Sequence, residues 1–166
     1  MLCLGSNLGD RMGELERAVR TLGPLVRAVS PVYRTPPWGP VPQDDYYNVI
    51  LLVCDPAVDD ELGPLPIRWL RRCQQLERQA NRVRAVRFGP RTLDADVIVV
   101  DEVSSDDPEL TLPHPRAHER AFVLVPWHAV DPDAVLPGHG PIERLLAALP
   151  ADEVAGIVEV GRIGGR

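Results

Sequence analysis

The chain has 166 residues, of which 45% are hydrophobic and 25% charged, and its formal net charge is −6. This length fits a single domain, and the composition is that of an ordinary globular protein, which argues against extensive disorder. The acidic net charge argues against general binding of nucleic acid or of anionic membranes.

All 18 basic residues are arginine, because the sequence contains no lysine. A P-loop and a protein-kinase site both need a lysine on the phosphates, and Schiff-base chemistry needs a lysine amine. The sequence excludes all three. Any phosphate chemistry in this protein must therefore use arginine and metal ions.

The cysteines Cys3, Cys54 and Cys73 are an odd, widely spaced set without a CxxC pair. They are expected to be small buried apolar residues in a reducing compartment, not a disulfide framework or a zinc site. The first residues show no secretory signal, and no apolar run reaches the length of a membrane span. We expect a cytoplasmic protein.

The first half of the chain predicts, in order, a strand, a helix, two strands and a second helix. Asp10 is expected to cap a helix whose apolar residues recur three and four positions apart, and Gly23 and Pro24 end it. Four prolines in 35–43 predict a shaped loop, and Pro31 indicates a sheet edge or a bulge. We expect strands at 1–4, 26–34 and 46–54, and a second helix at 67–80.

The second half predicts an arginine-rich loop up to residue 90, then a strand, then mostly helices. Pro126 is expected to interrupt the helix in which it lies. We expect one domain over 1–150 and a C-terminal tail over 151–166, with a weak edge strand and a frayed end. The other elements are expected at 92–100 (strand), 103–109 (acidic loop), 110–113 (brief strand), 118–130 (helix) and 142–149 (helix).

The order of these elements points to a fold class. Few of the predicted strands are separated by helices alone, which argues against a parallel, Rossmann-like sheet. The order favours an α+β fold, namely a ferredoxin-like α/β sandwich in which helices pack on a mostly antiparallel sheet.

The segment 91–100, RTLDADVIVV, carries two aspartates on a predicted strand. Side chains two residues apart share a face, so Asp94 and Asp96 are expected to lie side by side. Adjacent carboxylates are typical of a Mg²⁺ site that leaves coordination positions to substrate phosphates. The alternative is a pair of solvent-facing aspartates on an exposed sheet surface.

The loop before this strand is rich in arginine. The planar guanidinium group binds phosphate oxygens with two hydrogen bonds and keeps its charge at working pH. A triphosphate that chelates magnesium needs carboxylates on the metal side and cations on the open side. The alternative is a solvated basic loop that balances an acidic surface. The arginines concerned are Arg82, Arg84, Arg87 and Arg91.

Aromatic and amide side chains suggest a site for a flat heterocycle. Tyr46 and Asn48 share a face of a predicted strand, where a ring can stack and an amide can offer both a donor and an acceptor. The rigid loop around Trp38 suits hydrogen bonding from its backbone. The alternative is an ordinary sheet tyrosine and a tryptophan that plugs a loop.

A weaker cluster follows residue 112. His114 lies between two prolines in a rigid extended segment, where it and Arg120 can meet phosphate, and Phe122 can close an aromatic sandwich. A lone histidine is more often structural than functional. No role is assigned to His118, His128 or His139.

Together these clusters resemble the 6-hydroxymethyl-7,8-dihydropterin pyrophosphokinase family. The matching segments occur in the family's order, and RTLD-x-D is highly specific. They are GSNLGDR (5–11), YRTPP (33–37), YYN (46–48), GPRTLDAD (89–96) and LPHP (112–115).

The resemblance implies a ferredoxin-like α/β sandwich that transfers the β,γ-diphosphate of ATP to the hydroxymethyl group of the pterin and releases AMP. It implies two Mg²⁺ ions, bound with ATP by the metal ligands Asp94 and Asp96. The implied catalytic residues are Arg82, Arg84, Arg91, Asp94 and Asp96.

The resemblance also implies residues that bind the two substrates, ATP and the pterin, and we expect the enzyme to be a monomer. The implied ATP-binding residues are Gln74, Glu77, Arg84, Arg87, Arg91, Thr111, His114 and Arg120. The implied pterin-binding residues are Thr35, Pro36, Trp38, Tyr46, Asn48, Phe88 and Phe122.

Three positions depart from the family pattern. Phe88 stands where a tryptophan is frequent, Glu109 where some members have a basic residue, and Trp38 where others have a smaller apolar one. These departures bear on affinity more than on the type of reaction. Two other functions stay open: a metal-dependent nucleotide hydrolase that uses water as nucleophile, and a non-catalytic ferredoxin-like binding module.

Overall fold

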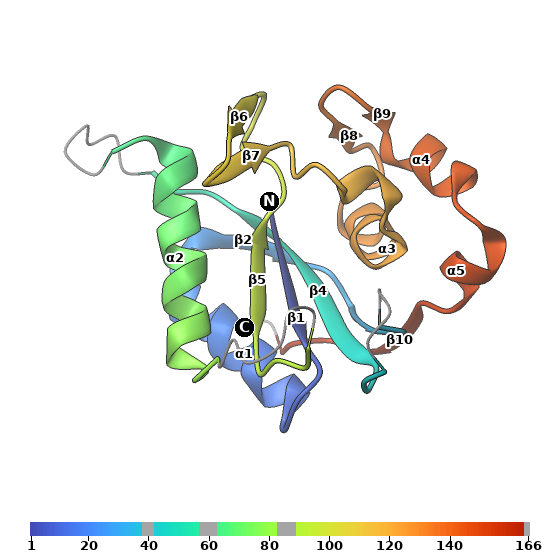
Figure 1. Ribbon diagram of the computed structural model, residues 1–166, viewed down its shortest axis with the longest axis horizontal. Helices are drawn as coiled ribbons and strands as arrows, with labels where there is room; N and C mark the ends of the chain where they lie inside the picture. The colour runs from blue at the N-terminus through green and yellow to red at the C-terminus, as the bar shows by residue number, and fades with distance from the viewer. Residues whose placement is uncertain (38–41, 57–62, 83–88, 165–166) are drawn as a thin grey trace.

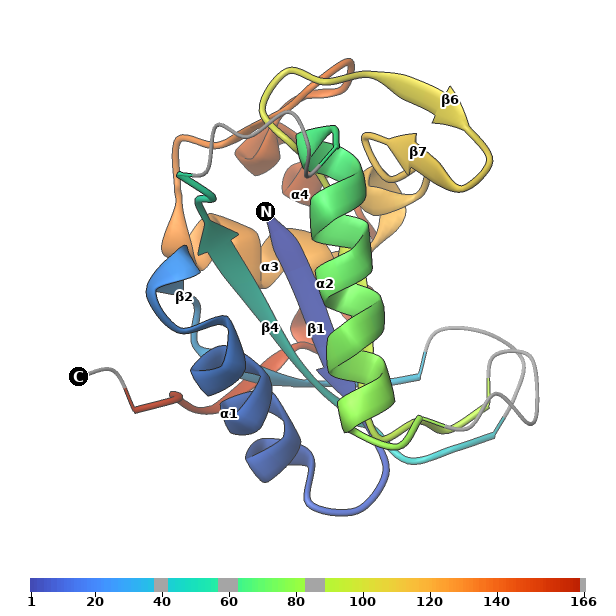
Figure 2. The same cartoon turned by 90° about the vertical axis from the view of Figure 1, so that its left-hand side faces the viewer.

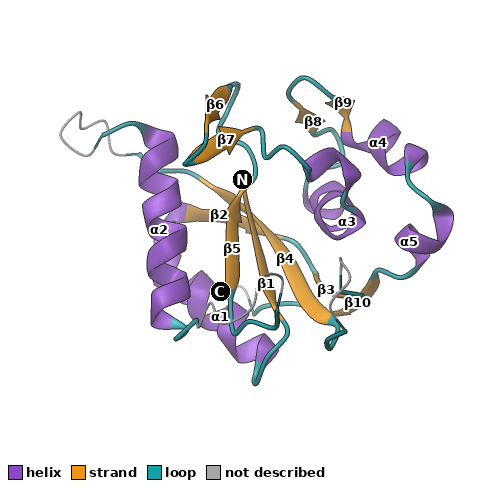
Figure 3. Ribbon diagram, viewed as in Figure 1, coloured by secondary structure: helices purple, strands orange, loops and turns teal. Residues whose placement is uncertain are grey.

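The computed structural model describes residues 1–37, 42–56, 63–82 and 89–164. In this part of the chain, six strands form one sheet with helices on both faces (Figures 1 and 3). The predicted α+β fold with a mainly antiparallel sheet is confirmed. Among the described residues, no helix is both long and apolar enough to span a membrane.

The sheet has the strand order β10–β3–β4–β1–β5, and β2 also pairs with β4. Each of these pairs is antiparallel. The long strand β4 therefore lies between β1 on one side and β2 and β3 on the other, and β10 forms the edge beyond β3. The strands are β1 (Leu2–Ser6), β2 (Val26–Val29), β3 (Val32–Thr35), β4 (Tyr46–Val53), β5 (Asp94–Val97) and β10 (Val158–Gly161).

Helices cover the two faces of the sheet. Helices α1 (Arg11–Leu22) and α2 (Leu65–Gln79) lie on one face, as Figure 2 shows from their side. Helices α3 (Ala121–Val130) and α4 (Ile142–Ala148) lie on the other face (Figure 1). The short helix α5 (Ala151–Ala155) leads to the edge strand β10.

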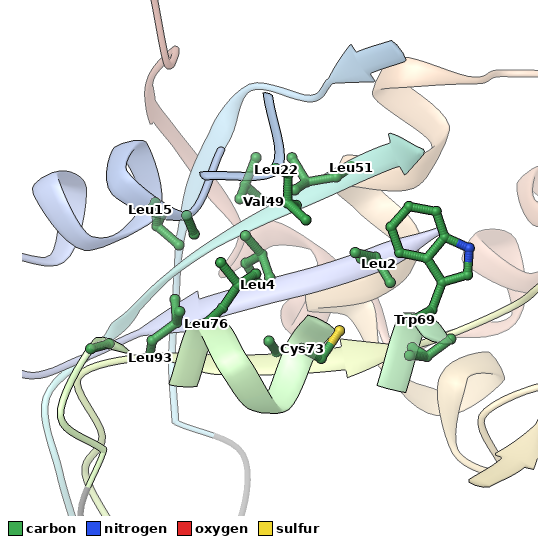
Figure 4. Close-up of a cluster of buried hydrophobic side chains, with 14 of the residues drawn as sticks. Leu2, Leu4, Leu15, Leu22, Val49, Leu51, Trp69, Cys73, Leu76 and Leu93 are labelled. Atoms are coloured by element: carbon green, nitrogen blue, oxygen red, sulfur yellow. The ribbon is translucent and has the colours of Figure 1, made fainter. Parts of the chain in front are cut away.

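Alternation along β1 divides the core into two layers. Leu2 and Leu4 face the α1 and α2 side, where they pack with Leu15 and Trp69 (Figure 4). Cys3 faces the opposite side and belongs to the second cluster, under α3 and α4. Full burial of each of these leucine side chains stabilises the fold by about 1.5–3 kcal/mol.

Helix α1 begins and ends as the sequence predicts. The Asp10 side chain accepts a hydrogen bond from the backbone N–H of Gly13 at 3.0 Å, which caps the first turn. Gly23 ends the helix with a φ of 53°, in the left-handed region that favours glycine.

The single strand expected at 26–34 is wrong, because two strands, β2 and β3, occupy this segment. The chain bends at Ser30, whose hydroxyl accepts the Ile50 N–H at 3.0 Å and donates to the Pro31 carbonyl at 2.7 Å. The Ser30 hydroxyl thus accepts a hydrogen bond from β4 that a backbone carbonyl would accept in a continuous strand. The bend keeps both short strands on β4 and agrees with the edge or bulge that Pro31 indicates.

Other boundaries in the second half of the chain also differ from expectation. The strand expected at 92–100 covers only β5 (Asp94–Val97). The acidic loop expected at 103–109 contains β6 (Ser105–Asp107), which pairs with β7 (Leu110–Leu112). Two further short strands, β8 (Val135–Leu136) and β9 (Gly140–Pro141), form a hairpin that the sequence did not predict.

Two single-residue expectations are wrong as well. Pro126 lies inside α3 and does not interrupt it; the helix starts at Ala121, after a 3₁₀ turn over Ala117–Glu119. Cys54 is exposed at the end of β4, whereas Cys3 and Cys73 are buried as expected. The segment 151–155, expected within a weak strand, forms α5 instead.

Candidate active site

A cavity of about 720 Å³ opens on the face of the sheet that α3 covers. It is bounded by β1, β4 and β5 below, and at its sides by the end of β3, the second half of α2 and the start of α3. Most of the described residues predicted for the site line it. They are Thr35, Pro36, Tyr46, Asn48, Gln74, Glu77, Arg82, Arg91, Asp94, Asp96, His114, Arg120 and Phe122.

The two aspartates of β5 face this cavity. β5 pairs with β1 so that Asp94 lies beside Gly5 and Asp96 beside Cys3, and these four residues share one face. Leu93 and Ala95 face the opposite side and are buried against α1 and α2. The alternation predicted from the sequence therefore holds: one face of β5 supplies carboxylates and the other supplies core.

Asp94 is held between two arginines. Its Oδ1 lies 2.7 Å from Arg82 NH1 and its Oδ2 accepts a hydrogen bond from Arg91 NH1 at 2.7 Å. Arg82 NH1 also contacts the buried carboxylate of Glu77, whose Oε1 accepts the backbone N–H of Ala95 at 3.1 Å. Glu77 thus fixes Arg82 and the edge of β5 from α2.

Asp96 lies near Arg120, with 3.9 Å between Asp96 Oδ2 and Arg120 NH1. Burial, and then the charge of Asp94, raise the pKa of the Asp96 carboxyl above its ordinary value. The three arginines beside these two carboxylates therefore do not fully offset the burial of Asp96 and its repulsion from Asp94. A cation placed between the two carboxylates would relieve both.

His114 and Arg120 form a second group of donors. The Nδ1 atom of His114 accepts the Arg116 backbone N–H at 3.1 Å, so a neutral imidazole carries its proton on Nε2. Nε2 lies 3.5 Å from Arg120 NH1, which can only donate. Burial and the Arg120 charge lower the pKa of His114 to about 4. Both side chains line the cavity and carry N–H donors, a combination that suits an anionic oxygen.

The wall of the cavity that β4 forms carries amide, hydroxyl and aromatic side chains, which suit an uncharged group. Asn48 is 5% exposed, and its Nδ2 donates to the Thr35 hydroxyl at 2.6 Å, which leaves its carbonyl oxygen Oδ1 as an acceptor. That oxygen lies over Gly5, where an added Cβ would come within 2.5 Å of it. Only glycine leaves this part of the floor open.

Aromatic rings from two layers complete this wall. Tyr46 comes from β4, and burial raises the pKa of its hydroxyl, which donates to Gln43 Oε1 at 3.1 Å. Phe122 comes from the first turn of α3, and the Arg120 guanidinium lies over its ring at 5.4 Å. A flat apolar ring can therefore contact aromatic side chains from both the sheet and the helix layer.

Comparison with known proteins decides the family. The sequence profile of 7,8-dihydro-6-hydroxymethylpterin-pyrophosphokinase (HPPK) matches residues 1–132. The chain belongs to this family. It is an ATP-dependent pyrophosphokinase of folate synthesis, a transferase whose substrates are ATP and the hydroxymethyl dihydropterin, as the sequence resemblance implies.

Individual relatives agree over nearly the whole chain. It is 47% identical over 165 residues to 2-amino-4-hydroxy-6-hydroxymethyldihydropteridine pyrophosphokinase of Mycobacterium tuberculosis, covering 92% of this chain and 85% of that protein. The protein of the same name from Mycobacterium leprae is 48% identical over 170 residues, covering 95% and 86%. Folic acid synthesis protein fol1 of Schizosaccharomyces pombe is 33% identical over 158 residues, which are 92% of this chain but 21% of that protein.

Some of the residues implied by the family lie elsewhere. Thr111 is in β7, where its hydroxyl donates to the Asp107 carbonyl at 3.2 Å, and it does not line the cavity. Glu109, a departure from the family pattern, does line the cavity. Four implied residues fall outside the described residues: Trp38, Arg84, Arg87 and Phe88.

The sequence reasoning missed three residues that shape the site. Gly5 forms the floor beneath Asn48, and Gln43 holds the Tyr46 hydroxyl. Asn7 is 3% exposed and bonds to residues on two walls of the cavity. Gly5 and Asn7 both lie in the GSNLGDR segment, so their place in a family motif was the available signal, but spacing alone gave neither a role.

The residues present fit magnesium. An ATP-using pyrophosphokinase generally depends on Mg²⁺, and this ion binds to proteins through one or two carboxylates while keeping positions for substrate phosphates. Asp94 and Asp96 provide such a pair on one face of β5, and burial, then the charge of Asp94, raise the pKa of Asp96. Among the described residues, no group of three or more His, Cys, Asp or Glu is arranged to hold a metal ion.

Proposed function

We propose that this cavity is where the diphosphate passes from ATP to 6-hydroxymethyl-7,8-dihydropterin. One observation carries the assignment: Gly5 pairs with Asp94 on β5 and with Asn48 on β4, so that the three residues form a row across three strands. Two strand spacings put the Cα atoms of Asp94 and Asn48 about 10 Å apart. A heterocycle at Asn48 and a phosphate chain at Asp94 would then lie on the same face of the sheet, with Gly5 between them and room for the hydroxymethyl group to point toward the phosphates.

The reaction balances without a covalent intermediate. The hydroxymethyl oxygen forms a bond to the β-phosphorus, the bond from that phosphorus to the oxygen bridging to the α-phosphate breaks, and AMP leaves with the electron pair. The hydroxyl proton passes to solvent. The chain needs only to align the two substrates and to neutralise charge.

Asp94 and Asp96 would hold Mg²⁺, with two ions arriving with ATP. When bound, these ions neutralise phosphate charge and lower the pKa of the attacking hydroxyl. Arg82 and Arg91 are fixed beside Asp94, so they meet the triphosphate with their remaining N–H groups. His114 and Arg120 supply two more donors for phosphate oxygens.

The heterocycle binds at the β4 wall. Asn48 Oδ1 accepts from a ring N–H, while Tyr46 and Phe122 contact the two faces of the ring. Thr35 orients the Asn48 amide, and Pro36 closes the side of the cavity. We assign Trp38 and Phe88 to pterin binding, and Arg84 and Arg87 to the phosphates, on the family motif alone.

Further proposals concern the state of the protein in the cell. We propose a monomer in the cytoplasm that does not bind nucleic acid, on the net charge of −6 and the dispersed cysteines. We also propose that residues 1–150 form the catalytic domain and that 151–166 are a tail.

Size-exclusion chromatography with light scattering tests the monomer, because the measured mass of a dimer would be twice that of the chain.

The reaction is tested by AMP release from ATP and Mg²⁺, with and without 6-hydroxymethyl-7,8-dihydropterin. We expect AMP only with the pterin, in equal amount to pterin diphosphate, and none when EDTA removes the metal. AMP or ADP formed without pterin would favour the nucleotide hydrolase instead. Folded protein that releases nothing in any condition would favour a binding module.

A further inference from the structure

We propose that Asn7 is a positioning residue that fixes the phosphate wall of the cavity relative to its heterocycle wall. The inference rests on the proposed function, because it takes the phosphates to lie at Arg91 and the heterocycle at Tyr46. Asn7 does not line the cavity and touches neither substrate in this arrangement. It acts through the two residues that do.

On the phosphate side, Asn7 holds the backbone of Arg91 at two points. Its Oδ1 accepts the Arg91 N–H at 2.8 Å, and its own backbone N–H donates to the Arg91 carbonyl at 3.2 Å. With its backbone fixed, Arg91 reaches Asp94 Oδ2 with NH1 at 2.7 Å. The turn after β1 thus sets where this guanidinium enters the cavity.

On the heterocycle side, Asn7 holds the segment that leads into β4. Its Nδ2 donates to Gln43 Oε1 at 2.9 Å and to the Asp44 carbonyl at 3.1 Å. Gln43 Oε1 also accepts the Tyr46 hydroxyl at 3.1 Å. The position of the Tyr46 ring is therefore tied to Asn7 through one shared acceptor.

The amide of Asn7 has the donors and the acceptor that its contacts with residues 43, 44 and 91 require. It has two N–H donors and one carbonyl oxygen, and each makes a hydrogen bond in a place where the residue is only 3% exposed. Aspartate would keep the acceptor for Arg91 but would present a second oxygen to the Gln43 and Asp44 oxygens. The two halves of the contact can therefore be separated by substitution.

The fold has independent supports near Asn7, so its loss is expected to leave a folded protein. Arg11 NH1 donates to the Asp45 carbonyl at 2.8 Å, and its guanidinium lies 4.1 Å from the centre of the Tyr47 ring. β1 is paired with β4 from Leu2 to Ser6 and with β5 from Leu2 to Gly5. The expected consequence of losing the Asn7 amide is misalignment, not unfolding.

The experiment compares Asn7→Asp, Asn7→Ala and a matched control, Ser30→Ala, by steady-state kinetics and thermal unfolding. Ser30 is buried like Asn7, and its replacement by alanine also removes side-chain hydrogen bonds to the backbone. Ser30 lies at the β2–β3 bend and not between the two walls of the cavity. In Asn7→Asp we expect the KM for pterin to rise about tenfold, with the KM for ATP and kcat changed less than about threefold. In Asn7→Ala we expect the same rise in pterin KM and also a fall in kcat of about tenfold.

Gln43→Leu provides a second route to the same result, since it removes the acceptor from the other end of the bond. It is expected to reproduce the pterin KM of Asn7→Asp. Unchanged kinetics in Asn7→Ala, at a melting temperature lowered as in Ser30→Ala, would show a purely structural asparagine and overturn the inference. Equal effects of Asn7→Asp on both substrates would overturn the division into two halves. Absence of pterin-dependent AMP in the unsubstituted protein would instead overturn the proposed function together with this inference.

Discussion

The two faces of β1 and β5 differ in packing and charge, although neighbouring residues along the same strands form them. On the face toward α1 and α2, Leu2, Leu4 and Leu93 are at most 1% exposed and belong to one hydrophobic core. On the face toward α3, Gly5, Asp94 and Asp96 leave a cavity with concentrated charge. One face holds the sheet to its helices, and the other is kept open for substrates.

The difference teaches where stability and activity are separable in this protein. A side chain on the closed face contributes by burial, and its loss leaves a cavity. A carboxylate on the open face raises the energy of the folded state unless a cation accompanies it. Substitutions on the two faces should therefore move different measurements.

The largest effect is expected for Asp96→Asn. Loss of a metal ligand should lower kcat by about 10³-fold, since metal ions contribute several kcal/mol to such transition states. The pKa of Asp96 is raised in the folded state, so its charge destabilises the fold at neutral pH and its removal should leave the melting temperature equal or higher. Kinetics and calorimetry on the same preparation check both. Asp106→Asn, on exposed β6, is the control, and near-normal turnover in Asp96→Asn would contradict the metal assignment.

The reverse pattern is expected for Leu15→Ala on the closed face. Leu15 of α1 is fully buried, and truncation should lower the free energy of unfolding by about 3 kcal/mol through lost burial and the cavity left behind. Urea unfolding at 25 °C measures this loss. Below the unfolding transition, kcat should stay within about twofold, and a large fall in kcat would show that the two faces are not separable.

Gly5→Ala should reduce pterin binding selectively. The new Cβ would lie 2.5 Å from Asn48 Oδ1, so the Asn48 side chain must move and lose its place as acceptor. We expect the KM for pterin to rise about tenfold, which corresponds to the loss of about one hydrogen bond, and the KM for ATP to change little. Gly164→Ala, which meets open space, is the matched control. A proportional rise in the KM for ATP would place the heterocycle elsewhere.

The smallest effect is expected in the pH dependence that His114 causes. Its pKa is about 4 when folded, against 6.5 for the ordinary side chain, so between these values the unfolded chain binds the extra proton. The neutral imidazole therefore contributes stability above pH 6.5, and this contribution is lost as the pH falls toward 4. The difference in unfolding free energy between the unsubstituted protein and His114→Gln measures it, because the opposing contribution of Asp96 is common to both. A difference that is constant with pH would contradict the burial of a neutral ring.

Patterns between nearby residues predicted the features that depend on strand alternation and on helix capping. Asp94 and Asp96 were placed on one face by their spacing, and Asp10 was identified as a helix cap. Contacts between distant segments could not be predicted in this way. The register that sets Gly5 between Asp94 and Asn48 depends on three strands, and the bend at Ser30 depends on its bond to Ile50. For the same reason, the role of Asn7 became visible only once residues 43 and 91 lay beside it.

The alternation of β5 also determines how the gene tolerates insertions and deletions. Because side chains alternate with a period of two, one codon added or lost just before Asp94 would turn both carboxylates into the leucine layer and bring Ala95 and Val97 into the cavity. Such a change would damage stability and chemistry at once. The turn over residues 101–104, before β6, is exposed and does not line the cavity, so it should accept a change of length. Variation in length among functional sequences is therefore expected at this turn and not in β5.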